Sequence, residues 1–334
     1  MKKIFTVFLM FMMISAVTGC SSSGKEGKEE GVHKVAIVQQ MDHASLDEIR
    51  IAIEKELEAK AESLGITVEY KVFNGQNDSS VLNQIGSQIV SDGYDVIIPI
   101  ATLAAQSMQA SAEEEEIPII FAAISDPVGA GLVESLDKPN SMVTGTSDYL
   151  DASQILDMML AQNPDTKTVG LLYSKSEDSS ELPIKEAKEF LDSKGIKYIE
   201  KTGTTTDEIS LAVDSMIGKV DAVFTPTDNT VAAAEITIAE KFIEAKIPHY
   251  TGADSFVRNG AFATCGVNYT DLGTVTADMA VDILQGADVK TYPVHVMEGG
   301  IITVNTETAE GIGADYSMFK EMASKVVEVV TSED

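Results

Sequence analysis

The sequence feature that most constrains the fold is a regular alternation of short β-branched runs with longer amphipathic segments. Val35–Val38 predicts a strand, and apolar residues at helical spacing over residues 46–64 predict a helix that Gly65 ends. Further strands are expected at residues 67–72, 95–100 and 117–121, with helices at 80–91 and 103–112 between them. Strands that alternate with helices form parallel sheets with both faces covered, so this run predicts one doubly wound α/β lobe.

The same alternation starts again near Asp151 and predicts a second lobe. Helices expected at residues 152–161, 184–194, 208–217 and 231–245 alternate with strands at 168–173, 197–200 and 222–224. Apolar residues at helical spacing also predict a last helix over residues 317–330. The length of 334 residues suits two domains. The expected fold class is therefore α/β with two doubly wound parallel-sheet lobes, which bind ligands at the carboxyl ends of their strands.

The first residues have the pattern of a secretion signal. Lys2 and Lys3 precede an apolar run too short to span a bilayer, and small residues lead from Val17 into Cys20. A cysteine at this place is typical of bacterial lipoprotein signals, which are cleaved before a cysteine that carries diacylglycerol. We expect residues 1–19 to be a signal peptide, Cys20 to be lipidated and residues 20–31 to form a flexible tether. The alternative is an ordinary secretory signal with an incidental cysteine.

The charge balance and the cysteine count exclude several kinds of partner. Lys and Arg number 24 against 53 Asp and Glu, a net charge of -29, so nucleic acid and anionic membrane surfaces repel the chain. The lipid is then the expected link to the membrane. With two cysteines in the sequence, lipidation of Cys20 leaves Cys265 unpaired. The four histidines show no metal-ligand spacing, so we expect no metal site.

Motifs of catalysis or cofactor binding are not recognisable in the sequence. The Gly-x-Gly stretches at residues 129–131 and 311–313 lack the third glycine of a dinucleotide fingerprint. The sequence also contains no P-loop, no recognisable Ser-His-Asp or Cys-His arrangement and no His-Glu-x-x-His stretch. We therefore expect a binding protein without a cofactor and without catalytic residues.

Polar clusters follow the predicted strands at their carboxyl ends, at residues 39–43, 101–102, 122–127, 173–180, 225–230 and 252–255. Thr102 begins a predicted helix, whose free backbone N–H groups attract an anion such as a carboxylate. Asp and Glu in the other clusters suit an ammonium group. Together the clusters favour a zwitterionic ligand. The alternative is that these Asp, Ser and Thr side chains are ordinary helix caps and turn residues, with Thr102 a plain N-cap.

Several long stretches resemble the substrate-binding proteins of ABC importers, above all the subgroup associated with tryptophan or tyrosine uptake. The stretches are VAIVQQMDHASLDEIR, NGQNDSSVLNQIGSQIVSDGYDVIIPIATLAAQ, IPIIFAAISDPVGAGLVESLDKPNSMVTGTSD, VGLLYSKSEDSS and VDAVFTPTDNTVAAA. The resemblance implies a type I periplasmic-binding-protein fold with three crossover strands and a ligand clamped between two lobes. It also implies that residues 32–146 and 270–291 form lobe 1, and that residues 147–269 and 292–334 form lobe 2.

The resemblance further implies which residues face the ligand. Carried over by position, they are Gln40, Asp42, His43, Ala101, Thr102, Ile124, Ser125, Asp126, Tyr173, Ser174, Glu177, Ser180, Thr227, Asp228, Asn229 and Asp254. We expect Thr102 and the N–H groups after it to bind the carboxylate. Glu177, Asp228 or Asp254 would bind the ammonium group, and Tyr173 would help to wall the side chain. Because the chain has no Trp, aromatic stacking must come from Tyr, Phe or His.

The sequence thus predicts a lipid-anchored receptor that captures a small ligand, an amino acid with an aromatic side chain, and delivers it to an ABC permease with a cytoplasmic ATPase. Alternatives are the same fold binding a sugar, a nucleoside or a branched-chain amino acid, and a sensor that reports ligand occupancy to a membrane kinase. A surface hydrolase is a further alternative, against which the missing catalytic constellation counts. A cytoplasmic repressor is excluded by the secretion signal and the lack of a basic helix-turn-helix segment.

Overall fold

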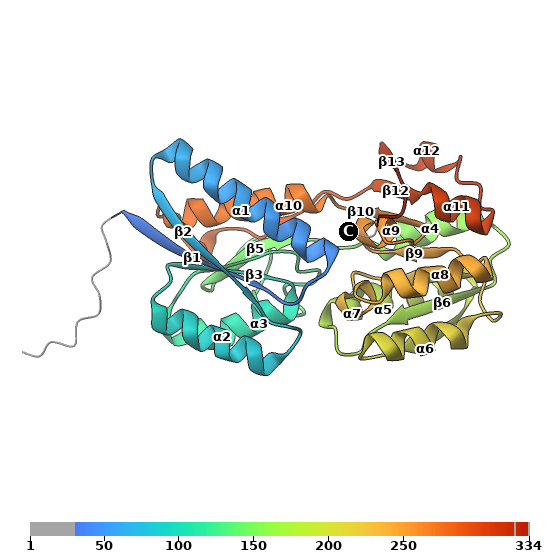
Figure 1. Cartoon of the computed structure of the whole chain (residues 1–334), viewed down its shortest axis with the longest axis horizontal. Coiled ribbons are helices and arrows are strands. Elements are labelled where there is room, and N and C mark those ends of the chain that lie inside the picture. Colours follow the sequence, from blue (N-terminus) through green and yellow to red (C-terminus); the bar gives the residue numbers. More distant parts are fainter. Residues whose placement is uncertain (1–30, 324, 333–334) are drawn as a thin grey trace, which may run out of the picture.

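The computed structural model describes residues 31–323 and 325–332 of the chain. The expected signal peptide, Cys20 and the tether up to residue 30 lie outside the described residues. Figure 1 shows two α/β lobes next to each other, each built around its own sheet. No helix in the described ranges has both the length and the apolar composition that a membrane crossing needs.

The first lobe contains a six-stranded sheet of order β11-β5-β4-β3-β1-β2 whose neighbouring strands all pair in parallel. Its strands are β1 (Val32–Gln39), β2 (Thr67–Asn74), β3 (Val96–Ile100), β4 (Ile119–Phe121), β5 (Val143–Ser147) and β11 (His295–Val296). The central strand β3 is buried along its whole length, as expected for a parallel sheet with helices on both faces.

Two pairs of helices cover the first sheet. α1 (Ala44–Leu64) packs along α10 (Tyr269–Leu284), and α2 (Ser79–Asp92) packs against α3 (Thr102–Ala112). Figure 1 shows the two pairs on opposite faces of the sheet. α1 ends where the sequence predicts, because Gly65 takes the left-handed conformation (φ 66°) that closes a helix. The α2–α3 face forms an apolar core of its own, which includes Leu82, Ile89 and Met108.

The second lobe contains a seven-stranded sheet of order β13-β12-β10-β9-β8-β6-β7. Its strands are β6 (Thr168–Tyr173), β7 (Lys197–Thr202), β8 (Ala222–Thr225), β9 (His249–Thr251), β10 (Ala263–Gly266), β12 (Ile301–Asn305) and β13 (Lys325–Val329). β10 and β12 pair antiparallel, and the other neighbours pair in parallel. Its helices are α4 (Ala152–Gln162), α5 (Glu181–Lys194), α6 (Thr206–Met216), α7 (Asn229–Ala232), α8 (Glu235–Ala245), α9 (Asp254–Arg258), α11 (Thr306–Ile312) and α12 (Phe319–Met322). Two doubly wound lobes are therefore present, and the predicted fold class is confirmed.

The chain crosses between the sheets in three places within the described residues: after β5, between β10 and α10, and between β11 and β12. The division of the chain into lobes by residue stays a prediction. Strand pairing differs from this predicted division at two places. Ser147 belongs to β5 of the first sheet, and His295 and Val296 pair with β5, although all three residues were expected in lobe 2. Parallel pairing with Thr146 and Ser147 holds this short segment, and neither local pattern nor composition reveals it.

The prediction of one helix over residues 317–330 is wrong. The structure has a short helix α12 and then the strand β13, which pairs with β12 in parallel. The run Lys325–Val329 is rich in β-branched residues, which favour a strand wherever a neighbouring strand supplies backbone partners. The helix predicted over residues 231–245 is likewise divided into α7 and α8.

Candidate functional site

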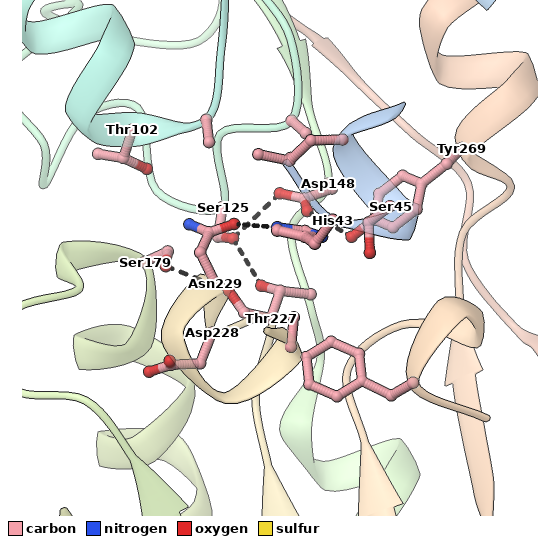
Figure 2. A pocket seen from close by; sticks show the side chains of 15 residues that line it. His43, Ser45, Thr102, Ser125, Asp148, Ser179, Thr227, Asp228, Asn229 and Tyr269 are labelled. Atoms are coloured by element: carbon pink, nitrogen blue, oxygen red, sulfur yellow. Dashed lines mark hydrogen bonds between the residues drawn. The ribbon is translucent and has the colours of Figure 1, made fainter. Parts of the chain in front are cut away.

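A small cavity lies where the two lobes meet at the carboxyl ends of their strands (Figure 2). Its lining residues are His43, Ser45, Leu46, Ala101, Thr102, Ala123, Ser125, Asp148, Ser179, Thr227, Asp228, Asn229, Ala232, Phe256 and Tyr269. Both lobes contribute side chains, and Asp148 comes from the first crossing segment between them. The free space is about 20 Å³, on the order of what one water molecule needs. The lobes are therefore closed on each other.

Direct polar contacts between the lobes surround this cavity. His43 Nε2 lies 3.0 Å from Asn229 Oδ1, and the hydroxyls of Ser125 and Thr227 lie 3.1 Å apart. Figure 2 draws both of these contacts as dashed lines. Further from the cavity, the amide of Gln106 donates to a carboxylate oxygen of Asp178 over 2.9 Å, and Arg258 forms an ion pair with Glu48. The closed arrangement is thus stabilised by the chain's own side chains.

The N-terminus of α3 forms one wall of the cavity. β3 ends at Ile100, and Ala101 turns the chain into the helix with φ 76° and ψ 163°, a backbone conformation that favours glycine. A hydrogen bond from Ala101 N to Ala122 O (3.1 Å) holds the turn. Thr102 is the first helical residue and not the N-cap, and the amide oxygen of Gln40 accepts from Leu103 N. The positive end of the helix therefore faces the cavity and suits an anionic group.

A buried carboxylate forms another part of the lining. Asp148 follows β5, and its two oxygens accept hydrogen bonds from the hydroxyls of Ser125 and Tyr269, each over 3.0 Å. Burial raises the pKa of Asp148, and the two hydroxyl donors only partly oppose that effect. Among the described residues no cationic side chain forms an ion pair with it. A cationic group in the cavity would therefore stabilise its ionised form.

Behind the cavity, a chain of hydrogen bonds links the two lobes through Glu177. Asn229 Nδ2 donates to Glu177 Oε2 over 2.8 Å, while Gln40 Nε2 and the Thr230 hydroxyl reach Glu177 Oε1 over longer distances of 3.4 Å. Burial, together with the nearby charge of Asp228, raises the pKa of Glu177 to about 8. This carboxyl group therefore holds its proton well above the pH at which an exposed glutamate loses it.

The structure brings seven of the sequence-predicted site residues to the cavity: His43, Ala101, Thr102, Ser125, Thr227, Asp228 and Asn229. Gln40 and Glu177 lie behind it, where they hold lining residues through the hydrogen bonds given above. Asp228 accepts from Ser174 N and from the hydroxyl of Ser180, so these two serines position Asp228.

The other predicted residues are outside the lining. Ile124, three residues after the end of β4, is packed in the α2–α3 core of the first lobe. Asp42 accepts from Asn74, and Asp126 accepts from the backbone N–H of Gly129 within its own loop. Asp254 forms an ion pair with Arg258, one turn along α9.

Tyr173 also lies away from the cavity. Its hydroxyl donates to Glu200 over 2.8 Å, and this draws the ring toward the β7 edge of the second sheet. There it lines a separate open groove with a volume of about 440 Å³, together with Lys175, Lys185 and Lys188. Within the described residues no cluster of His, Cys, Asp and Glu side chains is suited to a metal ion.

Eight lining residues were not singled out from the sequence, although Ala123 and Ser179 lie within predicted polar clusters: Ser45, Leu46, Ala123, Asp148, Ser179, Ala232, Phe256 and Tyr269. Asp148 follows β5, a strand that the pattern analysis did not predict, and a polar residue after that strand would have been the signal. Leu46, Phe256 and Tyr269 look like core residues in the sequence, and their exposure to the cavity depends on how the lobes meet.

The chain has relatives among known proteins over most of its length. Residues 34–326 match the family model described as ABC transporter substrate binding protein. The chain is 34% identical over 278 residues to the tyrosine-binding protein of Clostridioides difficile, an alignment that covers 83% of this chain and 80% of the other.

Two solved structures share this architecture, and their sequence identity to the chain is close to that of the tyrosine-binding protein. The ABC domain from Streptococcus pneumonia in complex with L-Trp is 33% identical, with a TM-score of 0.83 over 88% of this chain and 99% of the other. The ligand-free, open structure of a substrate binding protein with adhesive properties from Clostridium difficile is 34% identical, with a TM-score of 0.69 over 90% and 100%. The lower score for the open structure agrees with the closed arrangement of the lobes described above.

Proposed function

This chain belongs to the ABC transporter substrate-binding proteins, and from that premise we propose that it captures an aromatic amino acid outside the cytoplasm and delivers it for import. The family and the fold are those of binding proteins and not of enzymes. In the proposal, Cys20 carries the lipid that holds the protein at the membrane. A permease with a cytoplasmic ATPase then receives the ligand from the closed lobes.

The observation that carries the proposal is a helix N-terminus in the same cavity as a carboxylate that has no ion-pair partner among the described residues. The first turn of α3 offers the backbone N–H of Thr102 and the positive end of the helix dipole to the ligand carboxylate, whereas the N–H of Leu103 donates to Gln40. Asp148 offers two carboxylate oxygens to the ligand ammonium group. Leu46 and Phe256 supply apolar surface for an aromatic side chain. The C. difficile relative is named as a tyrosine-binding protein and the S. pneumonia structure contains L-Trp, which supports the same ligand class.

In the proposal, Asp148 takes the role that sequence reasoning gave to Glu177, Asp228 or Asp254, the binding of the ammonium group. Glu177 is surrounded by Gln40, Asn229 and Thr230, and Asp228 by backbone N–H groups and the Ser180 hydroxyl. Asp254 already has a cation beside it, the guanidinium of Arg258. Each of these three carboxyl groups thus has its own partners within the chain.

The cavity volume makes lobe movement part of the mechanism. About 20 Å³ cannot hold an amino acid, so the ligand enters only when the lobes separate, and they then close around it. The three crossing segments are the places where such a hinge motion occurs. The ligand favours closure by the difference between its affinities for the closed and the open states.

Calorimetry on the purified protein, stripped of co-purified amino acids, tests the ligand class. Tryptophan, tyrosine and phenylalanine are titrated beside leucine, ribose and a nucleoside, and we expect heat from aromatic amino acids alone. Asp148→Asn should weaken binding about 10- to 100-fold, because it removes a charge-assisted contact to the ammonium group. Asp126→Asn is the matched control, since Asp126 stays in its own loop. Binding of ribose or leucine with no response to aromatic amino acids would overturn the proposal.

A separate experiment tests the lipid anchor and the import role. In cells, Cys20→Ala should release the protein into the soluble extracytoplasmic fraction and abolish incorporation of labelled palmitate. Deletion of the gene should slow uptake of the radiolabelled amino acid that calorimetry identifies. Retention of the Cys20→Ala protein at the membrane would refute the anchor and leave the ligand class untouched.

A further inference from the structure

We infer that His43 selects ligands whose aromatic side chain carries a hydrogen-bond donor, a phenol O–H or an indole N–H, by accepting that hydrogen at Nδ1. The inference rests on the proposed function, because it assumes an aromatic amino acid in the cavity. It adds the residue that separates tyrosine and tryptophan from phenylalanine.

The first step is the orientation of the Asn229 amide. Its Nδ2 group lies 2.8 Å from Glu177 Oε2, which accepts the hydrogen bond. Its Oδ1 atom therefore points at His43 Nε2, 3.0 Å away on the other lobe. Because an amide oxygen only accepts, the hydrogen of this contact belongs to His43 Nε2. With the Asn229 amide in this orientation, the hydrogen of the His43 ring lies on Nε2.

The second step is the state of the other ring nitrogen. Burial lowers the pKa of His43, and the hydrogen bond to Asn229 and the charges of Asp47 and Asp42 oppose this only in part. The ring is therefore neutral near pH 7, with its hydrogen on Nε2 and a lone pair on Nδ1. Nδ1 is buried and has no hydrogen-bond partner among the residues that the structure describes. A buried acceptor without a partner destabilises the closed state unless a donor reaches it.

The third step is the surface around this nitrogen. Leu46 lies in the first turn of α1, whose N-cap residue is His43, and Ala232 lies three residues after Asn229 on α7. Leu46, Ala232 and Phe256 line the same cavity as His43. Thr102 and Asp148 are the groups suited to the charged ends of the ligand. The acceptor on His43 therefore belongs to the part of the cavity that is left for the side chain.

This arrangement predicts discrimination by a single hydrogen bond. A ligand that places a phenol O–H or an indole N–H at Nδ1 satisfies the acceptor, and a ligand of the same shape without a donor leaves it unpaired. The expected difference is about 10- to 100-fold in Kd. Two isosteric pairs measure it at constant size: tyrosine against 4-fluorophenylalanine, and tryptophan against 3-benzothienylalanine. The better pair shows whether the phenol or the indole is the natural donor.

Two variants of His43 separate recognition from lobe closure. In His43→Gln the side-chain NH2 takes the place of Nε2–H and keeps the contact with Asn229, but no acceptor remains at Nδ1. We expect its affinity for the donor-bearing ligand to fall to that for the isostere, so that the ratio of the two Kd values approaches one. In His43→Asn the amide oxygen takes the place of Nδ1 while the contact with Asn229 is lost. We expect both ligands to bind more weakly and the ratio to be retained.

Calorimetry with these four ligands on the wild type and both variants decides the question, with circular dichroism and thermal unfolding as the check on folding. A ratio near one in the wild type would overturn the inference while leaving aromatic binding intact. A wild-type ratio that persists in His43→Gln would also overturn it, because another group would then carry the discrimination. Failure of every aromatic amino acid to bind the wild type would instead refute the proposed function, and the inference with it.

Discussion

Replacement of Glu177 by Gln should make the folded protein more stable at neutral and alkaline pH. Glu177 is 5% exposed and lies at the meeting of the lobes, where its oxygens accept from Asn229, Gln40 and Thr230. Burial and the neighbouring Asp228 raise the pKa of Glu177 from 4.5 to about 8. Ionisation of this group is therefore penalised in the folded chain and free in the unfolded chain.

Whether stability rises or falls with pH follows from which state, folded or unfolded, binds more protons. Between about pH 4.5 and pH 8 the folded state holds a proton on Glu177 that the unfolded state has lost, so stability is fully present below about pH 4.5 and is lost as the pH rises toward 8. Each pKa unit corresponds to about 1.4 kcal/mol. The penalty is on the order of 3 kcal/mol at pH 7 and approaches a limit of roughly 5 kcal/mol above pH 8. Gln is neutral throughout and carries no such penalty.

Urea unfolding followed by circular dichroism at pH 5, 6, 7 and 8 measures the effect. We expect the free energy of unfolding of Glu177→Gln to exceed that of the wild type by an amount that grows with pH. Glu181→Gln, which changes an exposed carboxyl group near the start of α5, is the control and should show no such growth. Parallel pH profiles for the wild type and Glu177→Gln would refute the reasoning, because they would mean that Glu177 titrates alike in both states.

Two further changes test the packing of the first lobe and the contact between lobes. Gly145→Ala should destabilise the first lobe by about 3 kcal/mol or more, because the new Cβ would lie 2.0 Å from the backbone oxygen of Phe121 on the paired strand; the urea midpoint measures this, and an unchanged midpoint would contradict it. Glu48→Gln removes the partly exposed ion pair with Arg258 across the lobes but leaves the pair of Arg258 with Asp254, and should weaken ligand binding only two- to five-fold by calorimetry, since such pairs contribute about 0.5–1 kcal/mol. Lys241→Met removes an ion pair within the second lobe and should leave the Kd unchanged.

Local pattern was enough for most of the fold, because helices and strands of a parallel α/β protein differ in period and length. Val35–Val38 and the segment ending at Gly65 are where the pattern predicts them. The segment Lys325–Val329 shows the limit of this reasoning. Its valines fit one face of a helix, and they also fit a strand, and pairing with β12 decides between the two. That partner is remote in sequence, so period alone could not choose.

The site was predictable only as far as it follows strand ends. His43, Thr102, Ser125 and Asn229 each come after a predicted strand, and all four line the cavity. Tyr173 is the last residue of a strand, and its hydroxyl contacts Glu200 and lies away from the cavity. The direction in which a side chain points depends on its neighbours in space, and these cannot be read from a single sequence.

The affinity of this protein for its ligand depends on the contacts that the ligand makes with the closed lobes, less the contacts between the lobes that it displaces. The closed lobes already satisfy one another through pairs such as Ser125 with Thr227, and about 20 Å³ of free space remains between them. An amino acid that enters replaces some of these contacts with its own, so the binding free energy is only the difference between the two. At Asp148 and His43 Nδ1 a ligand adds contacts without displacing any ion pair or donor, because closure without a ligand leaves the first without a cation and the second without a donor among the described residues. Selectivity therefore follows from groups that closure buries but does not satisfy.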